Sequence, residues 1–124
     1  MFLAVEKYGG TSVGSVERIN AVADRVSASH QKGERLVVVV SAMAGETNRL
    51  LGLAEEIDSG AQAREMDVLV STGEQVTIAL LSMALNKRGI DARSYTGSQV
   101  QILTDNVHGK ARILDIDAAR VRDD

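Results

Sequence analysis

The sequence predicts an α/β fold in which helices are layered on a mainly parallel β-sheet. Short apolar runs typical of strands alternate along the chain with longer segments of helical periodicity. The run Leu36–Val40 is uninterrupted and mostly β-branched, which is the pattern of a strand covered on both faces in a parallel sheet. Because parallel strands are joined by right-handed crossovers, this order of elements favours a layered sheet.

The first strand is predicted at residues 2–7, and a helix is expected to follow from Ser15, a favourable N-cap residue. Gly33 is expected to end this helix. Its buried side is predicted from the apolar side chains that share one helical face: Val16, Ile19, Ala23 and Val26.

The second strand, Leu36–Val40, is followed by a predicted helix that ends near Gly60. The buried face of this helix is predicted from the residues Leu50, Leu53, Ala54 and Ile57. Residues 64–71 are compatible with either a helix or a short strand. Gln75–Lys87 is predicted to be a helix that is apolar nearly all round and therefore buried, with Gly89 ending it.

The last third of the chain is predicted to contain short elements. Ala92–Tyr95 is expected to be a third strand. Val100–Thr104 and Ala111–Ile116 are expected to be two further strands that form a hairpin across the intervening loop. Residues 117–122 are expected to begin another helix.

The composition excludes several classes of protein. At 124 residues the chain is at most one small domain, and without cysteine it has no disulfides, thiolate zinc site or cysteine nucleophile. A net charge of −3 with scattered basic residues argues against a nucleic-acid partner. Few apolar residues precede Glu6, and no stretch approaches the ~20 apolar residues of a membrane span. We therefore expect a cytoplasmic protein with no membrane partner.

The segment after the first strand carries the clearest functional signal. Lys7 lies at the end of the strand, and Gly9 and Gly10 follow closely. Adjacent glycines allow a ligand to approach the backbone, and the amides of a helix N-terminus favour an anion. Lys7 adds a mobile positive charge. The segment is predicted to bind phosphate, although an ordinary strand-to-helix turn with a surface lysine gives the same short pattern.

Two common glycine motifs do not describe this segment. In the P-loop the lysine follows the glycines and lies just inside the helix, whereas Lys7 precedes them. The fingerprint of dinucleotide-binding proteins needs a spacing that Gly9, Gly10 and Gly14 do not have. The phosphate site is therefore expected to be of another type.

A second candidate site follows the second strand. Ligands of open α/β sheets bind beyond the carboxyl ends of the strands, which places Ser41 and the Gly45–Asn48 turn at that edge. Ser41 and Thr47 offer hydroxyl groups, and amides that begin a helix suit a carboxylate. Thr47 could instead serve only as the N-cap of the second helix, a common role for threonine.

Glu74 is the third candidate. It is predicted in the first turn of the long apolar helix, where an acidic residue ordinarily compensates the helix dipole at under ~1 kcal/mol. A carboxylate beside an apolar helix also pairs strongly with a cation, because solvent screens the charges poorly there.

Three motifs in order along the chain resemble those of aspartate kinases, which are members of the amino-acid kinase family. They are K-Y-G-G-T-S-V-G-S at 7–15, V-V-V-V-S-A-M-A-G-E-T-N at 37–48 and S-T-G-E-Q at 71–75. Residues 94–99 and the pair Thr104–Asp105 are similar to the family as well. The resemblance implies a three-layer αβα sandwich of the carbamate kinase-like type with a mainly parallel sheet, present in part. It also favours a helix for residues 64–71.

The resemblance implies transfer of the γ-phosphate of ATP to the β-carboxylate of L-aspartate, the first step of lysine, threonine and methionine biosynthesis. Lys7 matches the essential, catalytic lysine of the family. The implied ATP-binding residues are Lys7, Tyr8, Gly9, Gly10 and Ser41. The implied aspartate-binding residues are Gly45, Glu46, Thr47, Asn48, Arg49 and Glu74, with Glu74 on the α-ammonium group. Mg²⁺ is expected to be carried on the nucleotide, with no dedicated protein ligands in this chain.

The match covers only the first half of a catalytic domain. Residues 1–124 are therefore expected to be its N-terminal part and to be inactive alone. By the resemblance, the catalytic aspartate, the arginine for the substrate α-carboxylate, the adenine site and regulatory ACT domains lie beyond Asp124. The full-length protein is expected to be a homo-oligomer. Two alternatives stay open: an amino-acid kinase for glutamate or acetylglutamate, and a non-catalytic binding or dimerisation module that kept the fold.

Overall fold

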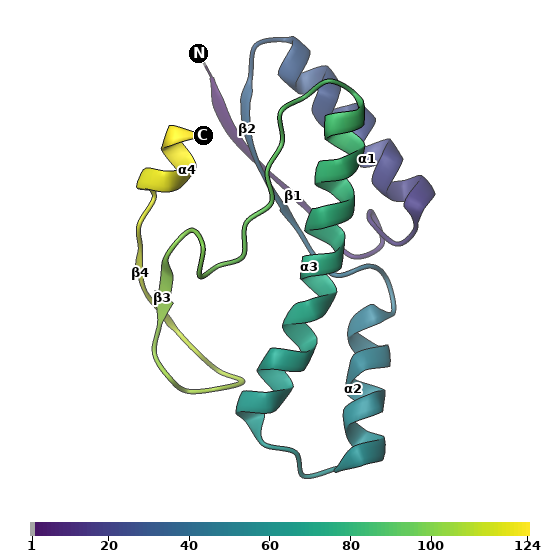
Figure 1. Cartoon of the computed structure of the whole chain (residues 1–124), viewed down its shortest axis with the longest axis vertical. Helices are drawn as coiled ribbons and strands as arrows, with labels where there is room; N and C mark the ends of the chain where they lie inside the picture. The colour runs from purple at the N-terminus through teal and green to yellow at the C-terminus, as the bar shows by residue number, and fades with distance from the viewer. Residues whose placement is uncertain (1) are drawn as a thin grey trace.

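The computed structural model describes residues 2–124. The elements follow in the order β1 (Leu3–Tyr8), α1 (Val16–Gln31), β2 (Arg35–Val40), α2 (Glu46–Ile57), α3 (Ala63–Lys87), β3 (Ile102–Thr104), β4 (Ile113–Ile116) and α4 (Ala119–Asp123). Figure 1 shows β1 and β2 side by side, with α3 running in front of them, α1 next to α3 and the β3–β4 hairpin on the other side.

Strands β1 and β2 are parallel and are joined through α1, as the sequence predicted. Their register runs from Leu3 opposite Arg35 to Tyr8 opposite Val40. Side chains alternate across β1, so that Glu6 and Tyr8 are half-buried while Leu3, Val5 and Lys7 are exposed. The sheet therefore has one face toward the helices and one open face.

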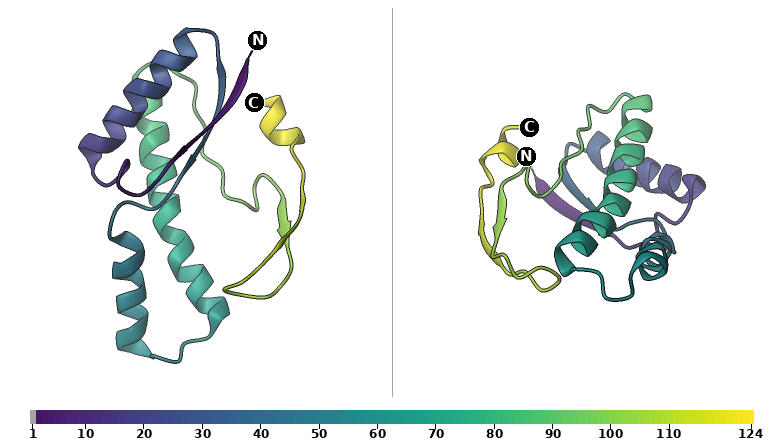
Figure 2. Two further views of the ribbon diagram at one scale, coloured as in Figure 1. Left: turned by 180° about the vertical axis from the view of Figure 1, so that it is seen from behind. Right: turned by 60° about the horizontal axis from the view of Figure 1, so that its bottom comes forward.

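The core lies between this sheet and the pair α1–α3. Its buried members are Val13, Ile19, Val22, Ala23, Val26, Val40, Leu81 and Leu85. From β2, Leu36 and Val38 pack against it, whereas Val39 on the opposite face is 46% exposed. The expectation that Leu36–Val40 is covered on both faces is therefore wrong for this chain. Figure 2, left, shows the strands with α3 behind them and no helix in front.

Helix α1 begins where the sequence predicted. The Ser15 side chain accepts a hydrogen bond from the Arg18 amide at 3.2 Å, which caps the helix. Ile19, Ala23 and Val26 are buried as expected, but Val16 is 64% exposed. Val13, in the preceding turn, is fully buried in the core, and we attribute the exposure of Val16 to Val13 taking its place at that end.

Helix α2 leaves the sheet and packs mainly against α3. Leu50 is buried, but Leu53 and Ile57 are exposed, so the prediction that they form a buried face is wrong. The reason is that the later turns of α2 extend beyond the core, and α3 is the described element against which α2 packs (Figure 1). Helical periodicity shows which residues share a face and not whether anything covers that face.

Helix α3 is one continuous helix of 25 residues, Ala63–Lys87. The helix predicted for residues 64–71 is confirmed and runs on into the helix predicted for 75–87. Its buried residues recur every four positions, at Gly73, Thr77, Leu81 and Leu85. Met83 is 63% exposed, so the prediction that this helix is buried all round is wrong.

Helix α3 is also long and apolar enough to cross a membrane by length and composition, with a mean hydropathy of 1.5 in its most apolar window. The expectation that no stretch has these properties is therefore wrong. By itself this is weak evidence, since a helix that packs inside a fold can have the same composition. In the structure α3 packs against α1, α2 and β2.

The last third of the chain forms the predicted hairpin but not the predicted third strand. β3 and β4 pair antiparallel, with Ile102 opposite Ile116. Within the part of the chain that the structure describes, Ala92–Tyr95 joins no β-ladder, because β1 and β2 pair only with each other. The hairpin loop contacts α3 through Asp67, which accepts a hydrogen bond from the Gly109 amide at 2.9 Å.

Candidate functional site

The two predicted anion sites lie at neighbouring strand ends. Lys7 is near the carboxyl end of β1 and Ser41 directly follows β2. The Ser41 amide donates a hydrogen bond to the Tyr8 carbonyl oxygen at 3.1 Å, which joins the two strand ends. The glycine segment after β1 and the turn after β2 therefore begin at the same edge of the sheet, where ligands of open α/β sheets bind.

The glycine segment leaves backbone donors free. Turns are closed by hydrogen bonds from the Ser12 amide to the Gly9 carbonyl at 3.0 Å and from the Val13 amide to the Gly10 carbonyl at 3.3 Å. In residues 2–124, no turn or loop hydrogen bond uses the amide of Gly9 or Gly10 as its donor. Helix α1 begins at Val16, as the Ser15 cap predicted, so five residues separate its first turn from Gly10 and its N-terminal amides do not lie directly after the two glycines. The predicted phosphate site therefore depends on the free loop amides of Gly9 and Gly10 and not on the N-terminal amides of α1.

Lys7 projects from the open face of the sheet. Its side chain is exposed, and its neighbour across the strands is Val39, which is also exposed. Among the described residues Lys7 takes part in no ion pair. An unpaired ammonium group on a flexible stem, next to apolar side chains, is free to follow an anionic ligand.

The Tyr8 side chain lies on the other face of β1. Its hydroxyl donates a hydrogen bond to Glu6 Oε2 at 2.6 Å, and Ser29 Oγ on α1 donates to Glu6 Oε1 at 3.4 Å. Burial, together with the hydrogen bond to the Glu6 carboxylate, raises the pKa of Tyr8 to about 12. The Tyr8 side chain is therefore held between the sheet and α1. The prediction that Tyr8 binds ATP now concerns only its backbone atoms.

This raised pKa gives a testable titration. In the 124-residue chain carrying Tyr95→Phe, Tyr8 is the remaining tyrosine and should ionise near pH 12, well above an ordinary tyrosine. A pKa raised in the folded state means that the pair stabilises the fold below pH 10 and loses this contribution as the pH rises toward 12. Ultraviolet titration measures it, and Glu6→Gln should move the tyrosinate transition to lower pH. An unchanged transition in Glu6→Gln would contradict the assignment.

The N-terminus of α2 carries no side-chain cap. Its N-cap residue is Gly45, with φ +79°, and Thr47 is already inside the helix. The alternative that Thr47 is merely the N-cap is therefore wrong. In the described residues, the amides of Thr47 and Asn48 donate to no turn or capping acceptor, whereas the Arg49 amide donates to the Gly45 carbonyl at 3.0 Å. Two free amides at a positive dipole end suit a carboxylate.

Glu46 and Arg49, both predicted to bind substrate, pair with each other. The Arg49 guanidinium donates two hydrogen bonds to the Glu46 carboxylate, at 2.6 and 3.1 Å. The hydrogen bond from Arg49 lowers the pKa of Glu46 and raises the pKa of Arg49. Both side chains remain accessible to solvent, so the pair can open toward a ligand.

Glu74 lies well inside α3 and not in a first turn, so helix-dipole compensation does not explain it. Its neighbour Gly73 is buried against the start of α2: a Cβ atom there would lie 2.9 Å from the Ala42 Cβ and 3.6 Å from the Glu46 Cγ. Glu74 is the next residue in the chain after this contact, and its side chain is exposed.

The sequence did not reveal the turn Ala42–Ala44, which Gly10, Gly14 and Gly73 approach closely. A Cβ atom at Gly10 would lie 3.1 Å from the Ala42 carbonyl oxygen, and one at Gly14 would lie 3.1 Å from the Ala44 Cβ. A helix continuous from residue 64 through Gly73 to residue 87 would have put a glycine in a helix interior, which is a signal of close approach.

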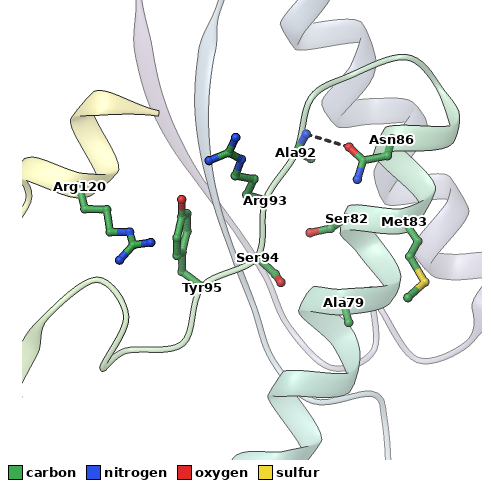
Figure 3. A pocket seen from close by; sticks show the side chains of 9 residues that line it. All are labelled: Ala79, Ser82, Met83, Asn86, Ala92, Arg93, Ser94, Tyr95 and Arg120. Atoms are coloured by element: carbon green, nitrogen blue, oxygen red, sulfur yellow. Dashed lines mark hydrogen bonds between the residues drawn. The ribbon is translucent and has the colours of Figure 1, made fainter.

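A separate hollow of about 460 Å³ lies between α3 and the segment before the hairpin (Figure 3). It is lined by Ala79, Ser82, Met83, Asn86, Ala92, Arg93, Ser94, Tyr95 and Arg120. Arg120 lies over the Tyr95 ring, 5.3 Å from its centroid. None of the predicted site residues lines this hollow, so we place the candidate site at the strand ends. In the part of the chain described here, no group of three or more His, Cys, Asp or Glu residues could hold a metal ion.

Comparisons with known proteins match this architecture. The sequence profile of the amino acid kinase family matches residues 3–123. The aspartate kinase of Pseudomonas fluorescens (strain SBW25) is 65% identical, a match that covers 100% of this chain and 30% of that protein. Aspartokinase 2 of Bacillus subtilis (strain 168) is 56% identical over 99% of this chain and 30% of its own length. The chain thus spans about 30% of the length of these curated relatives.

Solved structures confirm the predicted fold class, an αβα sandwich present in part. The crystal structure of aspartate kinase from Synechocystis has a TM-score of 0.77 and 57% identity, covering 79% of this chain and 17% of that one. Escherichia coli aspartokinase III, in complex with lysine and aspartate, has a TM-score of 0.76. It is 24% identical over 90% of this chain and 35% of that one, and supports the fold alone.

Proposed function

Because the chain belongs to the amino acid kinase family, we propose that it forms the N-terminal part of the catalytic domain of an aspartate kinase. The full-length enzyme transfers the γ-phosphate of ATP to the β-carboxylate of L-aspartate and releases 4-phospho-L-aspartate and ADP. The relatives that support this proposal are named aspartate kinases, and this chain spans about 30% of their length.

One observation carries the proposal: two turns with free backbone amides begin at adjacent ends of β1 and β2. Gly9 and Gly10 supply the first set of donors, and Thr47 and Asn48 supply the second. Phosphoryl transfer to a carboxylate requires two anions to be held close together and in line, mainly by positioning and by charge stabilisation. Two neighbouring anion-binding turns meet this requirement.

We assign the phosphate side to the segment after β1. The ammonium group of Lys7 neutralises charge that develops on the transferring phosphoryl group, and the amides of Gly9 and Gly10 hold phosphate oxygens. Ser41 adds a hydroxyl at the end of β2. ATP enters with Mg²⁺, which bridges its phosphates and lowers their charge.

We assign the aspartate side to the start of α2 and to Glu74. The amides of Thr47 and Asn48 bind a carboxylate of the substrate, and the exposed Glu74 pairs with its α-ammonium group. Gly45 opens the turn with its positive φ, and the Glu46–Arg49 pair borders it. Aspartate is thereby held at its two oppositely charged ends.

The test is a substrate panel with the full-length protein. Purified enzyme with Mg-ATP and hydroxylamine should form aspartyl hydroxamate from L-aspartate. One methylene is worth roughly 10–200-fold in kcat/KM, so L-glutamate should react at least about tenfold less efficiently. N-acetylglutamate lacks a free α-ammonium group for Glu74 and should not react. The 124-residue chain alone should be inactive. Preference for glutamate or acetylglutamate, or no turnover of any of the three, would contradict the proposal.

Two further predictions accompany this function. We propose that the enzyme works in the cytoplasm, where ATP is available, and that the full-length protein is a homo-oligomer. Apolar side chains left exposed on α2, such as Ile57, are consistent with further contacts in the complete protein. Sedimentation of the full-length enzyme measures the oligomeric state.

A further inference from the structure

The turn Ala42–Ala44 is closely approached by glycines of two segments. Gly10 and Gly14, in the loop after β1, approach it with would-be Cβ atoms 3.1 Å from the Ala42 carbonyl oxygen and from the Ala44 Cβ. Gly73 of α3 approaches the Ala42 Cβ. Ala42 itself is 4% exposed. The turn that leads into α2 therefore lies against both the phosphate segment and the helix that carries Glu74.

The contact at Gly73 is the tightest of the three. A Cβ atom at this position would lie 2.9 Å from the Ala42 Cβ, closer than two methyl groups can approach, so either α3 or the turn would have to move. Glycine is less favourable than alanine in a helix interior, and Gly73 lies deep inside α3. Helix propensity therefore disfavours glycine at position 73, but the close approach to Ala42 requires a residue without a side chain there.

The surroundings leave little freedom for α3 to adjust locally. Thr77, one turn further along, is fully buried, and its Oγ1 donates a hydrogen bond to the Gly73 carbonyl at 3.3 Å. The same side of Gly73 faces Glu46 Cγ and Leu50 Cδ1, each 3.6 Å from the would-be Cβ, in the first turns of α2. A displacement at Gly73 therefore changes the spacing between α3 and the start of α2.

We propose that Gly73 is a positioning residue for the amino-acid substrate, because its missing side chain sets the spacing between Glu74 and the free amides of Thr47 and Asn48. This inference rests on the function proposed above. An added methyl group separates the groups that hold the two ends of aspartate. The segment of Gly9 and Gly10 approaches the turn at the Ala42 carbonyl oxygen and not at the Ala42 Cβ, so binding of ATP is expected to be spared.

The test is a double-mutant cycle in the full-length enzyme with Gly73→Ala, Ala42→Gly and the double variant. The double variant moves one methyl group from one side of the contact to the other. Gly73→Ala should raise KM for aspartate roughly tenfold to hundredfold, with KM for ATP unchanged. The double variant should return KM for aspartate to the value of Ala42→Gly. Gly52→Ala is the matched control, because Gly52 lies in α2 with no atom near its would-be Cβ.

The outcomes distinguish a failure of the proposed aspartate kinase function from a failure of the positioning role of Gly73. If wild type and Gly52→Ala do not phosphorylate aspartate, the proposed function fails and this role fails with it. If wild type is active and Gly73→Ala has an unchanged KM for aspartate, or the double variant is not rescued, only the positioning role is overturned. If Gly73→Ala does not fold, the comparison of the double variant with Ala42→Gly still decides. An equal rise in KM for aspartate and KM for ATP in Gly73→Ala would indicate a general structural defect and would also overturn the positioning role.

Discussion

Replacing Lys7 by methionine is expected to lower kcat of the full-length enzyme by ~10²–10³-fold, the usual effect of removing one group that stabilises transition-state charge. Lys7 is exposed near the carboxyl end of β1, and it takes part in no ion pair among residues 2–124. Methionine keeps the length of the side chain and its packing beside Val39, so the loss should come from the charge. Initial rates of aspartyl hydroxamate formation at saturating ATP and aspartate measure it.

The matched control is Lys32→Met. Lys32 follows α1 and precedes the start of β2 at Arg35, which pairs with the start of β1, so its charge lies at the end of the strands opposite the candidate site. This variant should keep the wild-type kcat. Lys7→Arg should recover only part of the activity, because a planar guanidinium does not reproduce a compact ammonium group. A kcat for Lys7→Met within a few-fold of wild type would rule out a role for Lys7 in the transition state.

Replacing Leu81 by alanine is expected to have the largest effect on stability. Leu81 is 4% exposed and lies in the core between α1 and α3. Truncation of a buried leucine typically costs ~2–5 kcal/mol, a large part of the ~5–15 kcal/mol that stabilises an ordinary domain. Hydrogen exchange of the α1 and α3 amides in the full-length protein measures the loss as a lower free energy of opening.

Met83→Ala on the same helix is the control for this experiment. Met83 is 63% exposed in this chain, so its truncation should change the free energy of opening by less than ~0.5 kcal/mol. Equal losses in the two variants would show that α3 packs on both sides in the full-length protein. The described core would then be only one of two surfaces that stabilise the helix.

The elements with strong local signals were predicted well. The apolar runs of β1 and β2, their parallel connection through α1 and the Ser15 cap are confirmed. Each depends on features that a short stretch of sequence carries, namely β-branched runs, helical spacing and an N-cap residue. The motif positions also follow from the strands, because Lys7 and Ser41 lie near or just beyond strand ends that the sequence marks clearly.

Burial was predicted less well, because it depends on partners that are remote in sequence. Val16, Leu53 and Ile57 share helical faces with buried residues, yet they are exposed because Val13 fills the core at the start of α1 and because the later turns of α2 extend beyond the core. The start of α3 was also misplaced. Since residues 64–71 gave no decisive periodicity, Glu74 was assigned to a first turn that lies elsewhere.

The sequence by itself determined the order of elements, the two glycine-containing turns and the residues at the strand ends, because local propensity and periodicity act within one segment. Only the tertiary structure decided that the Tyr8 side chain faces Glu6 and that Gly73 is pressed against Ala42. It also decided that Thr47 lies inside α2 with its amide free. The Gly73–Ala42 contact depends on close packing between segments far apart in the chain, and α1 covers the Tyr8–Glu6 pair with Ser29, so no single segment specifies them. The place of Thr47 depends on where α2 begins, and Gly45 rather than Thr47 is the N-cap residue.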